Sequence, residues 1–143
     1  MKGRISSNII ALMLLTLLFQ KASLGQKTYH WIASGGGTYN FTSNWNPART
    51  SPNENDTLIF SNGGTYTVSN VPTFETVARV IVSNSTKVTF TAPTSSAISY
   101  TIKGDDGPGY DLLIDSGCEL NLDGTKAITL VLSTGATGSV SGS

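Results

Sequence analysis

Short segments of alternating apolar and polar residues run through the chain from residue 57 onward. Apolar residues take every second position, and β-branched or aromatic side chains predominate, as in TLIF, TYTV, KVTFT, SYTIK, CELNL and ITLVL. A period of two places successive side chains on opposite faces of a strand. Ser, Thr, Asn and Gly fill the intervals, as is typical of turns. The pattern therefore predicts an all-β protein.

The spacing of the apolar pairs favours a solenoid. Two interleaved series of pairs each advance in steps of about 20 residues. The first series is Leu58/Phe60, Val80/Val82, Tyr100/Ile102, Leu120/Leu122 and Val140, and the second is Tyr66/Val68, Val88/Phe90, Leu112/Ile114 and Leu130/Leu132. Two series in step predict a right-handed parallel β-helix with coils of about 20 residues. An antiparallel β-sandwich is the alternative, because its strands also recur at short, regular intervals.

Residues 26–55 differ from the predicted coils of residues 56–143. Between residues 31 and 45 this segment contains four large rings among Gly and Asn, namely Trp31, Tyr39, Phe41 and Trp45. The end of a solenoid exposes unpaired backbone groups and an apolar cross-section that must be covered. We expect the four rings to form an N-terminal aromatic cap, and Pro47 and Pro52 to stop further strand pairing.

The predicted coils have no equivalent cover at the other end. The sequence there reads STGATGSVSGS, in which Val140 is followed by no second strand. Gly, Ser and Thr are too small to cover an apolar cross-section. We therefore expect the coils to be truncated at the C-terminus, with further coils or modules of the same polypeptide beyond them.

Residues 1–25 have the layout of a secretory signal peptide. A positive start with Lys2 and Arg4 precedes the apolar run IIALMLLTLLF, which is too short to span a bilayer. Small residues then precede Gln26, the expected first residue of the mature chain. The sequence thus predicts a secreted or cell-surface protein with no membrane span in the mature chain.

Charge and cysteine content narrow the possible partners. Removal of Lys2, Arg4 and Lys21 with the signal peptide leaves six of the nine basic residues against nine acidic ones. This balance does not attract nucleic acid or anionic membranes. Cys118 is the only cysteine, so no internal disulfide is possible, and we expect it to be a small buried side chain.

The order of Trp, glycines, an aromatic ring, NW, Pro and then P…DTLIF resembles the start of bacterial surface proteins with autotransporter-associated β-strand repeats. The chain is also similar to secreted β-helix proteins of the Bacteroidetes type, in coils such as NGGTYTVSNVP and DLLIDSGCELNLDG. The recurrent positions are Trp31, Asn44, Trp45, Pro52, Asp56 and Phe60. Phe41 departs from the pattern, which more often has Trp there. The resemblance implies a right-handed β-helix in a larger, adhesin-like protein of the cell surface or outer membrane, and no catalytic residue.

Two groups of residues are candidates for binding. Asp105 and Asp106 in KGDDGPGYD, together with Asp111, are weak calcium candidates, because Ca²⁺ prefers oxygen ligands. The candidate sugar-stacking residues are Trp31, Tyr39 and Trp45. Such rings bind sugar faces if they are exposed, and they belong to the cap if they are buried.

Catalytic groups are not evident in the pattern. A glycosidase needs two carboxylates about 5 to 10 Å apart. Asp111 and Asp115 share the outward face of one strand, but strand geometry puts them about 13 Å apart. A single His and the lack of a Gly-rich phosphate loop argue against a Ser-His-Asp hydrolase or a nucleotide-binding enzyme. We expect no catalytic residue, no cofactor and no metal beyond the weak calcium candidates.

The sequence therefore favours a non-catalytic structural or adhesive domain outside the cell. Its expected partners are glycans or the surface of a host or neighbouring cell. One alternative is a carbohydrate-binding module that uses the aromatic rings. The other is the non-catalytic start of a polysaccharide-degrading β-helix enzyme.

Overall fold

The computed structural model describes residues 25–142. The signal peptide predicted over residues 1–25 lies outside this part of the chain, apart from Gly25. Strands dominate the described residues, and the one helical element that they contain is the short 3-10 helix η1 (Thr42–Asn44). The all-β prediction is confirmed.

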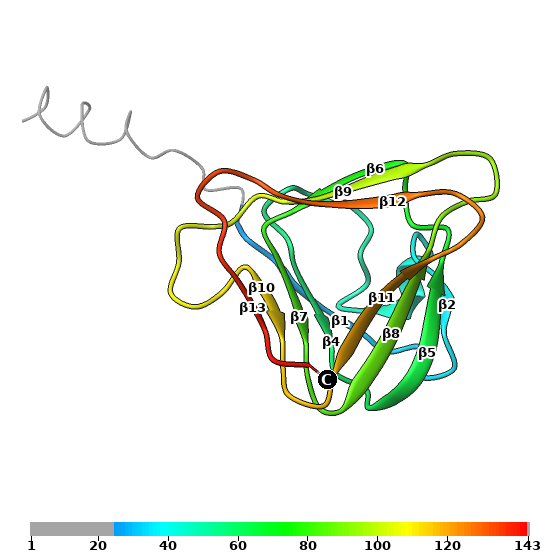
Figure 1. Ribbon diagram of the computed structural model, residues 1–143, viewed down its shortest axis with the longest axis horizontal. Coiled ribbons are helices and arrows are strands. Elements are labelled where there is room, and N and C mark those ends of the chain that lie inside the picture. The colour runs from blue at the N-terminus through cyan, green and yellow to red at the C-terminus, as the bar shows by residue number, and fades with distance from the viewer. Residues whose placement is uncertain (1–24, 143) are drawn as a thin grey trace, which may run out of the picture.

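The strands form three sheets around a common interior (Figure 1). Sheet A has the order β13-β10-β7-β4-β1-β3 and consists of β1 (Thr28–Trp31), β3 (Trp45–Asn46), β4 (Thr57–Phe60), β7 (Arg79–Val82), β10 (Leu112–Ile114) and β13 (Gly138–Val140). Sheet B has the order β11-β8-β5-β2 and consists of β2 (Gly37–Thr38), β5 (Gly64–Ser69), β8 (Thr86–Thr91) and β11 (Glu119–Asp123). Sheet C has the order β12-β9-β6 and consists of β6 (Phe74–Val77), β9 (Ile98–Ile102) and β12 (Ile128–Leu132).

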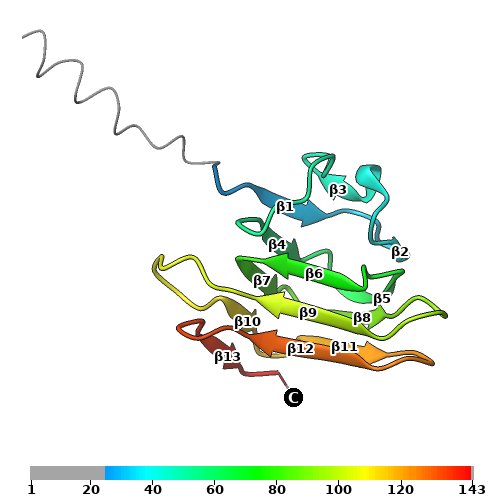
Figure 2. The ribbon, with the colours of Figure 1, turned by 90° about the horizontal axis from the view of Figure 1, so that it is seen from above.

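Neighbouring strands are parallel throughout, except for the pair of β1 and β3. In Figure 1 the chain runs counterclockwise from β10 through β11 and β12 to β13, while later coils lie nearer the viewer. Figure 2 shows the same coils stacked from β1 at one end to β13 at the other. This sense of rotation is right-handed. The prediction of a right-handed parallel β-helix is therefore confirmed, and the antiparallel sandwich is wrong.

The coils are longer than the 20 residues predicted. Stacked partners on sheet A are Leu58, Val80, Leu112 and Gly138, which are 22, 32 and 26 residues apart. Each complete coil supplies a strand to all three sheets, so the two apolar series mixed residues from different faces. Tyr100, for example, lies on sheet C rather than above Val80.

Two features explain the error in coil length. Of the two inward positions of β6, one holds Glu75 instead of an apolar residue and only the other, Val77, is apolar, so the first strand of sheet C gave no apolar pair. The loop of residues 103–111 also lengthens the coil between β9 and β10. A coil length estimated from apolar pairs alone therefore misses the first strand of sheet C. It also averages over coils of unequal length.

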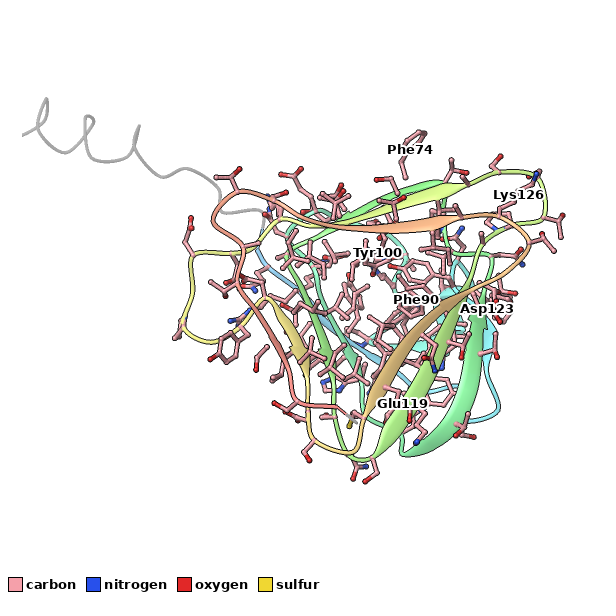
Figure 3. All side chains as sticks on the ribbon, in the orientation of Figure 1. Phe74, Phe90, Tyr100, Glu119, Asp123 and Lys126 are labelled. Atoms are coloured by element: carbon pink, nitrogen blue, oxygen red, sulfur yellow. The ribbon has the colours of Figure 1, made fainter. Side chains whose placement is uncertain are left out.

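The interior is filled by columns of inward side chains from successive coils. The ring centroids of Phe60 and Phe90 are 5.3 Å apart, and those of Phe90 and Tyr100 are 5.5 Å apart. Figure 3 shows Phe90 and Tyr100 pointing into the interior, whereas Phe74 points away from sheet C. Burial of each such ring stabilises the fold by about 2–3 kcal/mol. Cys118 is also buried, with 1% of its surface exposed, as predicted.

The cap segment of residues 26–55 also supplies a first layer of strands. β1 pairs in parallel with β4, and β2 pairs in parallel with β5. β3 then pairs antiparallel with the outer edge of β1, so the backbone edge of sheet A is covered at this end. Three of the four predicted cap rings are buried, but Phe41 is 63% exposed, because it precedes η1 on the outside of the molecule.

Candidate functional site

The predicted sugar-stacking rings are part of the core. Trp31, Tyr39 and Trp45 are all buried, and they meet edge to face, with Trp45 between the other two at centroid distances of 5.0 and 5.5 Å. The Trp31 indole N–H donates to the Ala33 carbonyl, and that of Trp45 donates to the Tyr39 carbonyl. No ring face is left for a ligand. These three residues are therefore cap residues and not a stacking platform.

A buried ionic cluster lies beside these rings. The Arg49 guanidinium donates from Nε to Asp56 Oδ2 at 3.0 Å and from Nη2 to Glu75 Oε1 at 2.8 Å. Its Nη1 is 3.3 Å from the Tyr39 hydroxyl, which donates to Glu75 Oε1 and shares a 3.0 Å hydrogen bond with the Tyr100 hydroxyl. We call these five residues the Arg49 cluster.

The Arg49 cluster is closed off from solvent, and its titration behaviour reflects this. Burial raises the pKa of Tyr39 well above its usual value, and burial together with the charge of Glu75 raises that of Tyr100. For Arg49, burial acts to lower the pKa, but the negative charge around it raises the pKa overall. The Asp56 and Glu75 carboxylates thus both have Arg49, which stays positively charged, as their partner. A cluster without access to solvent serves to hold elements together and not to bind a ligand.

The position of the Arg49 cluster explains its structural role. Glu75 lies on β6, the first strand of sheet C, and residues 28–46 add no strand to that sheet. Arg49 and Asp56 come from the segment that crosses the open end of the interior at this point. The ionic contacts therefore fasten this segment where strand pairing does not. Sequence reasoning missed the cluster, although Glu75 at an inward position of an alternating strand was a usable signal.

Two of the residues predicted to bind calcium, Asp105 and Asp111, lie around the positively charged side chain of Arg79 instead. Arg79 Nε lies 3.5 Å from Asp105 Oδ2 and 3.5 Å from Asp111 Oδ1. Asp111 Oδ2 also accepts hydrogen bonds from the Thr137 backbone N–H and hydroxyl. Asp106 is exposed and takes no part in these contacts. The guanidinium thus occupies the place where a cation would bind these carboxylates.

The environment of Asp105 agrees with this arrangement. Partial burial acts to raise its pKa, but the Gly107 N–H, the Gln26 amide and the charge of Arg79 together lower it. Within residues 25–142, no three His, Cys, Asp or Glu side chains are placed so that they could hold a metal ion. The geometry therefore gives no support to calcium at Asp105, Asp106 and Asp111.

The outer face of sheet B carries regular rows of mainly polar side chains. Its outward side chains are stacked in two rows, Thr65–Lys87–Glu119 and Thr67–Thr89–Asn121. Strand geometry sets about 4.8 Å between side chains within a row and about 7 Å between rows. Lys87 and Glu119 form an ion pair, and the hydrogen bond from Lys87 lowers the pKa of Glu119. We call these six residues the sheet B face.

The described residues contain no helix of the length and apolar character needed to cross a membrane. Comparison of the chain with protein-family models, with curated proteins and with solved structures gives no match. The resemblance to autotransporter-associated repeat proteins stays a prediction. Any function must therefore be argued from the geometry of this chain.

Proposed function

We propose that this chain is a non-catalytic, exported structural or adhesive domain. Its solenoid forms a rigid body whose inward residues are used for packing, so function belongs to the side chains that point outward. In the polar clusters described above, Arg49 and Arg79 are each held between two carboxylates of the same chain. Neither cluster leaves a free acid, base or nucleophile in position for catalysis.

The sheet B face is the observation that carries this proposal. It is an array in which three Thr hydroxyls and the Asn121 amide lie at intervals fixed by the strands, and each hydroxyl both donates and accepts hydrogen bonds. An extended glycan also presents hydroxyl groups at regular intervals. We infer that the sheet B face binds glycans on a host or neighbouring cell surface, through many weak hydrogen bonds rather than one deep pocket.

A binding assay with two matched triple variants tests this proposal. One variant carries Thr67→Ala, Thr89→Ala and Asn121→Ala on sheet B, and the control carries Thr76→Ala, Thr101→Ala and Thr129→Ala on the outer face of sheet C. All six side chains point outward, so both variants keep the fold.

Attachment to a panel of immobilised polysaccharides and to whole cells is then measured. We expect the sheet B variant to bind at least about tenfold more weakly, because three hydrogen bonds of about 0.5–1.5 kcal/mol each are lost. The control should bind like the original chain. Equal binding by all three proteins, or attachment to no surface, would contradict the proposal. Release of shortened sugars from the polysaccharide would instead favour an enzyme.

A carbohydrate-binding module built on the N-terminal rings is the weaker candidate. Trp31 and Trp45 are buried, so the tryptophan emission maximum should lie at short wavelength and should not move when glycans are added. A shift of that maximum on addition of a glycan would revive this alternative.

A further inference from the structure

A further row of outward side chains lies beside the two rows of the sheet B face. Its members, stacked by the parallel pairing of sheet B, are Thr38 on β2, Ser69 on β5, Thr91 on β8 and Asp123 on β11. Ser69 and Thr91 lie side by side because the residues directly before them are paired. We call these four residues the Thr38 row. The row next to it, Thr67–Thr89–Asn121, is called the Thr67 row.

The two rows carry hydroxyl groups at fixed intervals along the solenoid axis, from β2 to β11 (Figure 1). Their four threonines are exposed or partly exposed, so the hydroxyls are within reach of a ligand. Ser69 instead donates its hydroxyl to the Gly37 carbonyl. The spacing is about 4.8 Å within a row and about 7 Å between the rows. The rows therefore border a strip about as wide as one sugar ring.

An exposed aromatic ring stands at the β2 end of this strip. The Phe41 N–H donates to the Thr38 carbonyl at 3.1 Å, so Phe41 lies one turn beyond the Thr38 row. Phe41 is 63% exposed, although Tyr39 and Trp45 on either side of it in the sequence are buried. An exposed ring beside a line of hydroxyls suits a sugar, whose apolar face stacks on the ring while its edges make hydrogen bonds.

The charges of the face disfavour an acidic ligand. Lys87 is ion-paired with Glu119 of the same coil stack, and Asp123 stands at the end of the Thr38 row. Figure 3 labels Glu119 and Asp123 along β11. One basic and two acidic residues thus give the three rows a net charge of −1. A carboxylate accepts hydrogen bonds from neutral hydroxyls, but it repels a ligand that carries carboxylate or sulfate groups.

On the basis of the glycan binding proposed above, we propose that this strip takes a neutral, extended, β-1,4-linked glycan that runs along the solenoid axis. Such a chain advances per sugar by nearly the same length as the coils, which are about 4.8 Å apart. Each successive sugar therefore meets the next coil in the same way, and the sugar beyond Thr38 stacks on Phe41. An α-1,4-linked chain curves and leaves a straight row. A chain laid along one strand meets outward side chains only about every 7 Å, which does not match its own repeat.

Five tetrasaccharides test the class of glycan, and NMR titration of the backbone amides measures each Kd. Three are neutral and β-1,4-linked, built from glucose, mannose or N-acetylglucosamine. Maltotetraose is the control for linkage, and β-1,4-linked tetraglucuronate is the control for charge. We expect at least one neutral β-1,4-linked chain to bind about tenfold more tightly than both controls, and its affinity to rise about fivefold with each sugar from the dimer to the tetramer, because each sugar adds about one hydrogen bond.

Two matched pairs of variants test the path of the chain. Phe41→Ala is compared with Phe74→Ala, since Phe74 is also strongly exposed (83%) but lies on sheet C. Thr38→Ala is compared with Thr65→Ala, since both side chains are exposed on sheet B but Thr65 lies outside the strip. All four positions are exposed, so the fold should be kept. We expect Phe41→Ala and Thr38→Ala each to weaken binding about fivefold, and the two controls to bind like the original chain.

A nitroxide label on the reducing end of the best tetrasaccharide tests the direction of the chain. If the chain follows the axis, the label lies at one end of it and broadens the amide signals around β2 or those around β11, but not both. A chain that lies across the axis would instead place the label beside the ends or starts of several strands of sheet B at once.

Three results would overturn the proposal. The first is that maltotetraose or tetraglucuronate binds as tightly as every neutral β-1,4-linked chain. The second is that the two members of either matched pair of variants have equal effects, and the third is broadening that places the chain across the axis. If the triple variant of the Thr67 row still loses binding, these results contradict the class and path of the glycan but leave the proposed function standing. Binding to no glycan at all would overturn both.

Discussion

Replacement of the buried Arg49 by Met should strongly reduce the stability of the fold. Arg49 is buried and makes ion pairs with Asp56 at 3.0 Å and with Glu75 at 2.8 Å. Methionine keeps much of the apolar volume but removes the charge and all the donors. Two carboxylates are then left in the interior without their positive partner.

The size of the effect follows from this arrangement. Removal of one partner from a buried ion pair costs about 3–5 kcal/mol, mainly because the remaining charge is uncompensated. A loss of about 4 kcal/mol would take a large share of the 5–15 kcal/mol that stabilises a typical domain. With a denaturant slope of about 2 kcal/mol/M, the urea midpoint should fall by about 2 M. Fluorescence of Trp31 and Trp45, which lie beside the cluster, reports the transition.

Two further variants decide whether the reasoning is right. Arg79→Met makes the same chemical change at a guanidinium that is more accessible (16% against 2%) and 3.5 Å from its carboxylates, so it should cost clearly less than Arg49→Met. Addition of Glu75→Gln to Arg49→Met should recover part of the loss, since it removes one uncompensated charge. If Arg49→Met and Arg79→Met are equally destabilising, or if Glu75→Gln makes the first variant worse, the interpretation of the cluster is wrong.

Three other predictions follow from single positions. Val88→Asp should unfold the domain and Thr89→Asp should not, because Val88 points inward and Thr89 outward; equal thermal midpoints would contradict the strand phase. Burial raises the pKa of Tyr66 to about 12, and its hydroxyl has no hydrogen-bond partner in residues 25–142. Between about pH 10 and pH 12, Tyr66 is therefore neutral in the folded protein but ionised in the unfolded chain, where tyrosine titrates near pH 10. The part of the folding stability that depends on Tyr66 is complete below about pH 10 and is lost as the pH rises towards 12. Tyr66→Phe should therefore reduce the alkaline loss of stability in urea titrations and add about 1 kcal/mol at neutral pH; an unchanged alkaline profile would refute this. Mass spectrometry of the exported chain should find Gln26 as its first residue, and retention of residues 1–25 would show that the leader is not cleaved.

The sequence determined the fold class because that depends on local chemistry. Alternation of apolar and polar residues fixes which side chains face inward, and turn residues mark where each strand stops. The inward positions of Leu58, Val80 and Val88 follow from this pattern and are confirmed. The N-terminal rings could likewise be assigned to a cap from the sequence, because an end of the solenoid needs covering. Only the structure, in which Trp31, Tyr39 and Trp45 are buried, excluded a role for them in stacking on sugars.

Only the tertiary structure decided which strands lie above one another. Apolar pairs on different faces look alike in sequence, so Tyr100 and Leu120 were placed in one column although they lie on sheets C and B. The same limit applies to charged residues. Arg49 and Glu75 are 26 residues apart and belong to different elements, and their contact exists because the segment after β3 crosses an interior that lacks a strand on that side. Long-range pairing of this kind depends on the path of the backbone through space, which a local pattern does not contain.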